Sequence, residues 1–169
     1  LQQSSAASDV YKRQMLICAF VGMLLAEQTV SSYSYLFIAL TGIALCAASA
    51  AAINQVVDRE ADASMKRTDQ RPLPKGDLSV MHASIFAFVI GLLGSMILYL
   101  YVNTLTMILT IGSLIGYAFI YTVYLKRATP QNIVIGGLAG AAPPLLGWSS
   151  VTNTIDPCLL YTSPSPRDW

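Results

Sequence analysis

The chain has 169 residues, enough for one domain, and 54% of them are apolar while only 11% are charged. Soluble domains carry roughly 25% charged residues, so this composition excludes an ordinary water-soluble globular protein. The formal net charge of +1 provides no basic field for nucleic acid, and high hydrophobicity with low net charge excludes a disordered chain.

The two ends of the chain differ from everything between them. Residues 1–14 and 158–169 are polar and unpatterned, and both resemble translated adaptor sequence of the kind that contaminates assembled sequencing data. We therefore expect residues 15–157 to be the native part, with two non-native flanks. We also expect the natural protein to begin earlier and to continue further.

Hydrophobic segments follow one another along residues 15–157. A helix needs about 20 apolar residues to cross about 30 Å of hydrocarbon. The apolar run from Met15 to Ala26 is too short, because its 12 residues reach only about 18 Å. Four later segments are long or nearly long enough to span: 34–57, 80–102, 104–125 and 132–149. Together with the first run they predict an all-α polytopic transmembrane bundle of about five helices, which is part of a larger bundle.

The connections between these segments alternate in charge. Residues 58–79 contain five basic residues and residues 126–131 contain two, whereas the connections near 27–33, 103 and 150–156 contain none. The positive-inside rule places the basic connections in the cytoplasm. It predicts a multi-pass protein of the cell inner membrane, or of the mitochondrial inner membrane in a eukaryote.

Small residues and prolines add two expectations about packing. The GxxxG spacings at residues 112–116 and 136–140 predict close approach between helices. Pro143 and Pro144 remove two backbone donors, so the last segment should kink or break there. The three cysteines lack CxxC spacing and are odd in number, which predicts neither a disulfide framework nor a zinc site.

The most informative stretch begins at the end of the second segment. Asn54, Asp58 and Asp62 are four residues apart, and each step of four turns a helix by only about 40°, so they should share one face. Two carboxylates about 6 Å apart repel each other unless a cation lies between them. Hard oxygen ligands that also meet substrate phosphates select Mg²⁺, so these residues predict a magnesium site.

Basic residues follow the acidic ones directly. The side chains of Lys66, Arg67 and Arg71 suit phosphate oxygens, and a metal on one side with basic groups on the other describes a diphosphate clamp. The alternative is that these residues only flank a membrane span and fix its topology, with the acids as counter-charges. The four-residue register and the RxxxRP pattern favour the clamp.

These residues resemble a known family. The pattern NxxxDxxxD at residues 54–62, followed by RTxxRP at residues 67–72, is similar to the first aspartate-rich motif of the intramembrane aromatic prenyltransferases of the UbiA type. Those proteins are polytopic helical enzymes that bind an isoprenyl diphosphate through Mg²⁺. Residues 121–148 narrow the resemblance to the branch that farnesylates protohaem IX, and the resemblance covers about residues 15–157.

The resemblance implies a reaction, substrates and roles for individual residues. The reaction is transfer of a farnesyl group from farnesyl diphosphate to a vinyl group of haem b, with Mg²⁺ as cofactor in a lipid bilayer, and terminal oxidase assembly factors are further partners. The family's second aspartate-rich motif is absent, so we expect this fragment not to turn over. Three residues would be catalytic: Asp58, Asp62 and Tyr121. The metal ligands would be Asn54, Asp58 and Asp62, and the diphosphate contacts would be Asn54, Lys66, Arg67, Arg71, Lys126 and Arg127.

Two further features have ordinary explanations. Tyr117, Tyr121 and Tyr124 repeat at helical spacing, which is more typical of packing or an aromatic belt than of a catalytic lining. Of these only Tyr121 is a candidate for cation–π stabilisation of the reaction. His82, the sole histidine, stands at the start of the third segment, where an interfacial role is favoured over an iron ligand.

Two other functions remain open at this point. A prenyltransferase acting on 4-hydroxybenzoate or a similar quinone precursor would share the clamp, and only residues 121–148 argue against it. A transporter would use Asp58 and Asp62 as an ion site, but they lie at a helix end rather than near the bilayer midplane. We also expect residues 58–79 to form a structured cap over a cavity at the basic side.

Overall fold

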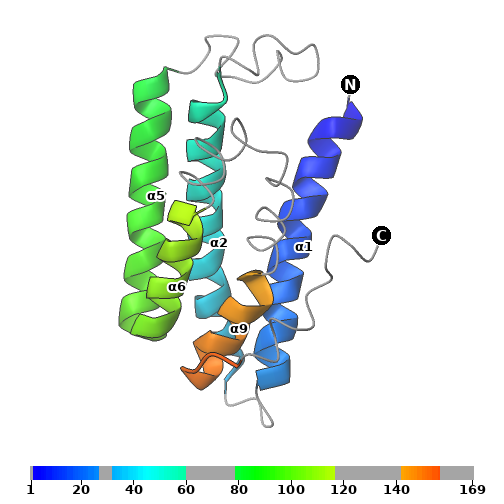
Figure 1. Ribbon diagram of the computed structural model, residues 1–169, viewed down its shortest axis with the longest axis vertical. Coiled ribbons are helices and arrows are strands. Elements are labelled where there is room, and N and C mark those ends of the chain that lie inside the picture. Colours follow the sequence, from blue (N-terminus) through cyan, green and yellow to red (C-terminus); the bar gives the residue numbers. More distant parts are fainter. Residues whose placement is uncertain (1, 27–31, 60–78, 117–141, 157–169) are drawn as a thin grey trace.

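A computed structural model describes residues 2–26, 32–59, 79–116 and 142–156. The described residues form helices and contain no strand, which confirms the predicted all-α class (Figure 1). The helices are α1 (Gln2–Ala26), α2 (Tyr33–Val57), α5 (Val80–Tyr101), α6 (Thr104–Ile115) and α9 (Ala142–Thr152).

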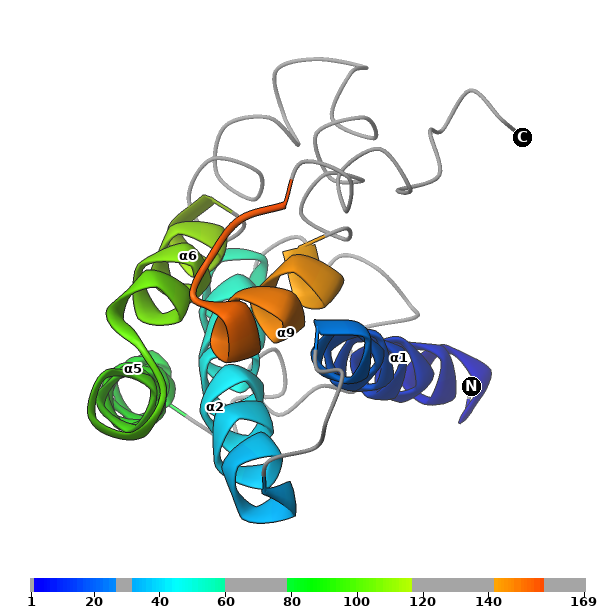
Figure 2. The same cartoon turned by 90° about the horizontal axis from the view of Figure 1, so that it is seen from below.

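The helices define two ends of the bundle. At one end α2 finishes at Val57 and α5 starts at Val80; we call this the basic end, because the basic residues 59–75 connect these helices in sequence (Figure 1). At the opposite, neutral end α5 finishes and α6 starts. Viewed from the neutral end, α9 lies among α1, α2 and α6 and packs against all three (Figure 2).

Two helices have the length and composition of membrane spans. They are α2 and α5, with mean hydropathies of 2.3 and 2.2, and their bounds match the predicted segments 34–57 and 80–102 closely. Large apolar side chains such as Phe86 and Phe88 on α5 are 61% and 71% exposed, as expected for a face in contact with lipid. The described part of the chain therefore has two helices that are long and apolar enough to cross a membrane.

The other predicted segments differ in length from the observed helices. The apolar part of α1 is short, as predicted, but the helix continues back to Gln2, through residues of the expected flank 1–14. Helix α6 ends at Ile115, and residues 117–125 of its predicted segment lie outside the described residues. The two flanks stay a prediction.

Helix α9 begins directly before the two prolines. Pro143 and Pro144 occupy its first turn, where backbone N–H groups have no partner inside the helix and proline is tolerated. The prolines thus lie in the first described turn of α9, and the kink or break expected at them stays a prediction. Residues 132–141, the first part of the predicted segment, lie outside it.

Small residues allow α2 and α5 to pack closely. A Cβ atom added to Gly94 would lie 2.8 Å from the sulfur of Cys46 and 2.9 Å from the carbonyl oxygen of Gly42. The Ser49 hydroxyl donates a 2.7 Å hydrogen bond to the carbonyl of Ala87 on the other helix. In lipid, where apolar burial does not drive helices together, such close packing and interhelical hydrogen bonds hold the pair.

Among the described residues, no helix makes the predicted close approach at the GxxxG spacing of residues 112–116. Within the described chain, a Cβ atom added to Gly112 or Gly116 would meet nothing within 4 Å. Close approach occurs instead where α1 meets α9: an added Cβ on Gly22 would meet the carbonyl of Pro144, and one on Gly147 would meet the carbonyl of Ala19. The second spacing, at residues 136–140, lies outside the described residues.

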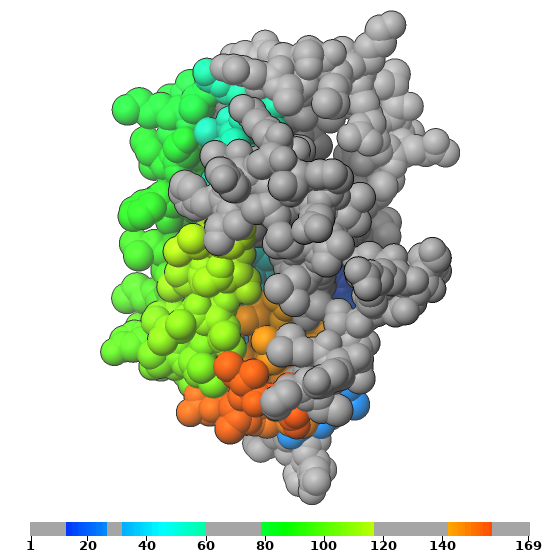
Figure 3. Space-filling model, in the orientation of Figure 1, coloured from blue at the N-terminus to red at the C-terminus, as the bar shows by residue number. Residues whose placement is uncertain are grey.

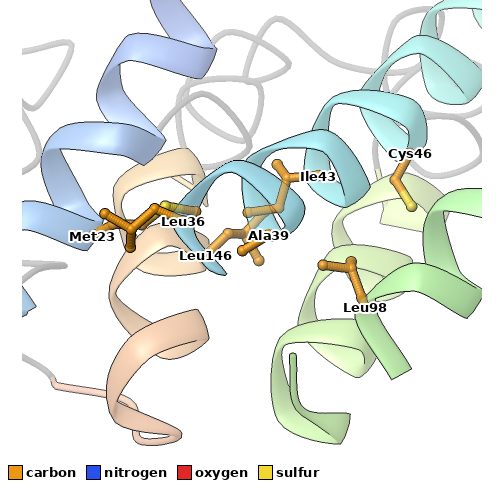
Figure 4. Close-up of a cluster of buried hydrophobic side chains, with 7 residues drawn as sticks. All are labelled: Met23, Leu36, Ala39, Ile43, Cys46, Leu98 and Leu146. Atoms are coloured by element: carbon orange, nitrogen blue, oxygen red, sulfur yellow. The ribbon is translucent and has the colours of Figure 1, made fainter. Parts of the chain in front are cut away.

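An apolar core joins four helices. Met23 of α1 and Leu146 of α9 meet the α2 side chains at the neutral half of the bundle, and Leu98 of α5 packs on the other side of α2 (Figure 4). Each of these three is at most 5% exposed. The full cluster consists of Met23, Leu36, Ala39, Ile43, Cys46, Leu98 and Leu146.

One side chain ties α6 to α9 at the neutral end, where the surfaces of these two helices adjoin (Figure 3). The Asn103 carboxamide oxygen accepts a 2.7 Å hydrogen bond from the Thr106 N–H and so caps α6. Its amide nitrogen donates to the carbonyls of Ser149 and Ser150 at 2.9 and 3.1 Å. Tyr35 of α2 also donates to the Ser150 carbonyl, so three helices meet here.

We expect Asn103→Asp to lower the free energy of unfolding by about 1–3 kcal/mol. Aspartate still caps α6, but it cannot donate to the last carbonyls of α9 and brings negative charge toward them. Asn103→Ser is the matched control, because serine keeps the cap without the charge and should cost less. Denaturant titration in micelles, followed by circular dichroism, measures both; equal stability of all three proteins would contradict the assigned contact.

Candidate diphosphate site

Two of the predicted site residues lie together at the basic end of α2. Asn54 is in the last turn of the helix, and Asp58 is its C-terminal cap. The backbone N–H of Asp58 donates a 2.9 Å hydrogen bond to the carbonyl of Asn54, so the residues stand one helical turn apart. The structure therefore keeps the four-residue register between them.

The predicted face shared by all three residues can be followed as far as Asp58. Helix α2 ends at Val57, and Asp58 has φ −85° and ψ 2°. The place of Asp62 on the same face stays a prediction. Asp62 itself lies outside the described residues.

Asp58 is a buried carboxylate at the end of a helix. The residue is 8% exposed. In general, a nearby positive charge stabilises an ionised carboxylate that is removed from water. The role of Asp58 as a ligand of a cation stays a prediction.

The donor atoms at this end suit a magnesium ion bound together with a diphosphate. Asn54 offers an amide oxygen and Asp58 a carboxylate, both hard ligands. In the part of the chain that the structure describes, no three His, Cys, Asp or Glu side chains gather into a metal site. Magnesium sites next to substrate phosphates commonly use only one or two carboxylates. The two ligands offered by Asn54 and Asp58 are therefore compatible with a magnesium site of this kind.

The other predicted site residues are not among those described. The structure describes the chain up to Arg59 and again from Ser79, and both of these residues are at the basic end (Figure 1). The predicted cap at residues 58–79 therefore falls almost entirely outside the described ranges. The same holds for these site residues: Asp62, Lys66, Arg67, Arg71, Tyr121, Lys126 and Arg127.

His82 takes part in capping α5. The hydroxyl oxygen of Ser79 accepts a 3.3 Å hydrogen bond from the His82 backbone N–H and lies 2.6 Å from the imidazole Nδ1. Both side chains are exposed at the basic end. Ser79 thus caps α5, and the contact gives His82 a structural role at the start of this helix.

The fold and the site together define a class. The chain is a helical membrane protein with a buried carboxylate at one end of a span and basic residues next to it in sequence. Its sequence matches the UbiA prenyltransferase family over residues 15–165. The chain therefore belongs to the UbiA prenyltransferase family, which confirms the resemblance seen in its motifs.

Within this family, the chain is similar to proteins that share one specific name. The chain is 60% identical over 141 residues to "Protoheme IX farnesyltransferase 2" of Pseudoalteromonas atlantica, covering 83% of this chain and 46% of that protein. It is 54% identical over 161 residues to "Protoheme IX farnesyltransferase" of Idiomarina loihiensis, covering 92% and 54%. The chain thus spans about half the length of these relatives.

A solved structure supports the fold. The apo structure of a UbiA homologue from Aeropyrum pernix K1 is similar with a TM-score of 0.66 and 22% sequence identity. The similarity covers 89% of this chain and 54% of that one. The arrangement of α-helices described above is therefore that of the family.

Proposed function

We propose that this chain forms the diphosphate-binding half of a protohaem IX farnesyltransferase. In the complete enzyme the farnesyl group of farnesyl diphosphate is transferred to a vinyl group of haem b, which yields haem O. The observation that carries this proposal is the 54–60% identity to relatives that bear this name. The buried Asp58 at the end of α2 supports the placement of the diphosphate there.

The residues of the site have distinct roles in this proposal. Asn54 and Asp58 would hold Mg²⁺ through their side-chain oxygen atoms, and the ion would supply positive charge that offsets the negative charge developing on the leaving group. Asp62 would complete the ligand set. Hydrogen bonds to the phosphate oxygens would come from Lys66, Arg67, Arg71, Lys126 and Arg127.

The reaction breaks the C1–O bond of farnesyl diphosphate, the π bond of the haem vinyl group and one O–H bond of water, and it forms one C–C bond and one C–O bond. Cleavage between C1 and oxygen releases diphosphate and leaves an allylic farnesyl cation. The haem vinyl group attacks C1, and water adds to the resulting cation and loses a proton, which gives a hydroxyethylfarnesyl side chain. Apolar helices exclude water until that last step, and the ring face of Tyr121 would stabilise the cation.

The location and partners follow from the same proposal. The basic end would face the cytoplasm, or the mitochondrial matrix in a eukaryote, because the basic connections are at this end. Farnesyl diphosphate and haem b would meet there at the membrane surface. Terminal oxidase assembly factors would receive the product.

An acceptor assay tests this function. In a chimera, residues 15–156 of this chain replace the matching part of the Pseudoalteromonas atlantica protein. Supplied with farnesyl diphosphate, the chimera is expected to convert haem b to haem O and to leave 4-hydroxybenzoate unchanged, as measured by mass spectrometry of the products. Prenylation of 4-hydroxybenzoate with haem untouched would contradict the acceptor assignment and favour the quinone-precursor alternative.

A further inference from the structure

Tyrosine side chains gather at the neutral end of the bundle. Every tyrosine whose side chain the structure describes lies in the first turn of α2 or the last turn of α5: Tyr33, Tyr35, Tyr99 and Tyr101. Tyr35 is half-buried and donates to the Ser150 carbonyl. The side chains of Tyr33, Tyr99 and Tyr101 are 77%, 59% and 62% exposed. These phenol groups thus face the surroundings of the protein at one end.

Tyr99 and Tyr101 point to nearly opposite sides of α5, because two residues correspond to a turn of about 200° along a helix. Tyr99 continues an exposed apolar stripe with Leu92 and Met96, at spacings of four and three residues. A protein partner docked on one side of α5 would cover only one of the two tyrosines. A layer that surrounds the helix at one level would meet both, which favours lipid over a protein partner.

The length of α5 places its last turn at a membrane boundary. Its 22 residues span about 33 Å at 1.5 Å per residue, close to the roughly 30 Å of hydrocarbon in a bilayer. The last carbonyl groups of a helix have no partner inside it, and unsatisfied carbonyl groups are costly in hydrocarbon. Because α5 ends at Tyr101, this end of the helix belongs in the polar layer next to the hydrocarbon.

The exposed tyrosines have the chemistry that anchors a helix end in this layer. Residues 78–125 contain no Asp, Glu, Lys or Arg, so the turn between α5 and α6 has no charged group to hold it near water. The Asn103 side chain in this turn is already bonded to Thr106 and to α9. A tyrosine ring is apolar along its body and polar at its hydroxyl group, and such rings are enriched at membrane interfaces.

We propose that Tyr33, Tyr99 and Tyr101 form an aromatic belt that binds the headgroup layer of the lipid leaflet opposite the basic end. The rings lie beside the upper acyl chains, and the hydroxyl groups donate to ester and phosphate oxygens of the lipids. The belt depends on the chain being a membrane protein and not on the proposed transferase function. It fixes the depth of the neutral end, as the basic connections do at the other end.

Fluorine NMR tests the depth of these rings in the 169-residue chain, labelled with fluorotyrosine in bicelles. The lipids carry a nitroxide either near the glycerol end of the acyl chain or at its methyl end, and Tyr99→Phe assigns the Tyr99 signal. We expect the nitroxide near the glycerol to relax this signal several-fold more than the other. Leu92→Tyr is the control, since it places a ring on the same stripe about 10 Å deeper and should show the reverse order. Stronger relaxation of Tyr99 by the methyl-end nitroxide, or by neither nitroxide in this chain or in the chimera, would overturn the belt.

Arginine substitutions test the same depth by their cost. Leu92 and Tyr99 are both more than half exposed on one stripe, so the substitutions change surroundings of similar packing. Leu92→Arg should lower the folding equilibrium constant in vesicles roughly a hundredfold, because it puts a charge near the bilayer centre. Tyr99→Arg should lower it by no more than about fivefold, as expected for a charge at an interface. Denaturant titration measures both constants, and equal losses for the two variants would contradict an interfacial position of Tyr99.

Discussion

Asp58→Asn is expected to lower farnesyl transfer by the chimera by on the order of 10² to 10³, the usual effect of losing one group that stabilises charge in the transition state. The same substitution should leave the fold intact. Asparagine is nearly the size of aspartate and keeps a polar side chain at the end of α2, so the free energy of unfolding should change by no more than about 1 kcal/mol. A large loss of rate without a loss of stability separates a functional carboxylate from a structural one.

The control for this experiment is Asp156→Asn. Asp156 follows α9, whose last turn contacts Asn103 at the neutral end, and its substitution should preserve the transfer rate. Product formation at saturating farnesyl diphosphate and denaturant titration measure the two quantities. If the Asp58→Asn variant kept a transfer rate near that of the parent, the diphosphate site would be wrong. The acidic and basic residues in 54–75 would then only fix the topology of the membrane span.

The largest effect on stability is expected from Gly147→Ala. A Cβ atom at this position would meet the backbone carbonyl of Ala19 and come within 3.1 Å of the backbone nitrogen of Met23, both on α1. Backbone atoms cannot rotate away as a side chain can, so α1 and α9 would have to separate. We expect the free energy of unfolding to fall by about 3 kcal/mol or more, the upper part of the range for overpacking.

Gly112→Ala is the matched control for this substitution. It is also a glycine inside a helix, but an added Cβ atom meets nothing within 4 Å in the described structure. Because alanine favours the helix over glycine by about 1 kcal/mol, this variant should be equally or more stable than the parent. If the two variants lost stability equally in the same denaturant titration, the assigned contact between α1 and α9 would be wrong.

The sequence predicts the long spans well because their ends carry strong local signals. Helix α2 finishes where the uncharged stretch gives way to Asp58 and Arg59, and α5 starts after the polar residues that precede Val80. The start of α9 is harder to predict, because Pro143 and Pro144 are compatible with a kink as well as with a first turn. Local composition does not distinguish these two cases.

The contacts between helices could not be predicted from the spacing of glycines in the sequence. The glycines at 112 and 116 have the expected pattern but no near neighbour in the described chain, whereas Gly22 and Gly147 make the closest approach without it. Which helix faces meet depends on the whole bundle. The contact of Asn103 with Ser149 has the same origin, since the two residues are 46 positions apart in the chain.

The candidate site was predictable in its residue types and not in its environment. The four-residue spacing of Asn54 and Asp58 gave their shared face from the helical period alone. The burial of Asp58 could not be predicted, because it depends on how the chain packs around the end of α2. Asp62 and the basic residues after it stay predictions.

The measurement that tests the central claim most directly is a titration of the transfer rate with Mg²⁺, for the parent chimera and for Asp58→Asn. If the end of α2 binds the diphosphate through a divalent cation, EDTA should abolish transfer by the parent and added Mg²⁺ should restore it. Asp58→Asn should then need a much higher Mg²⁺ concentration for any activity. A parent rate that is insensitive to EDTA, or an Asp58→Asn curve that coincides with that of the parent, would contradict the site.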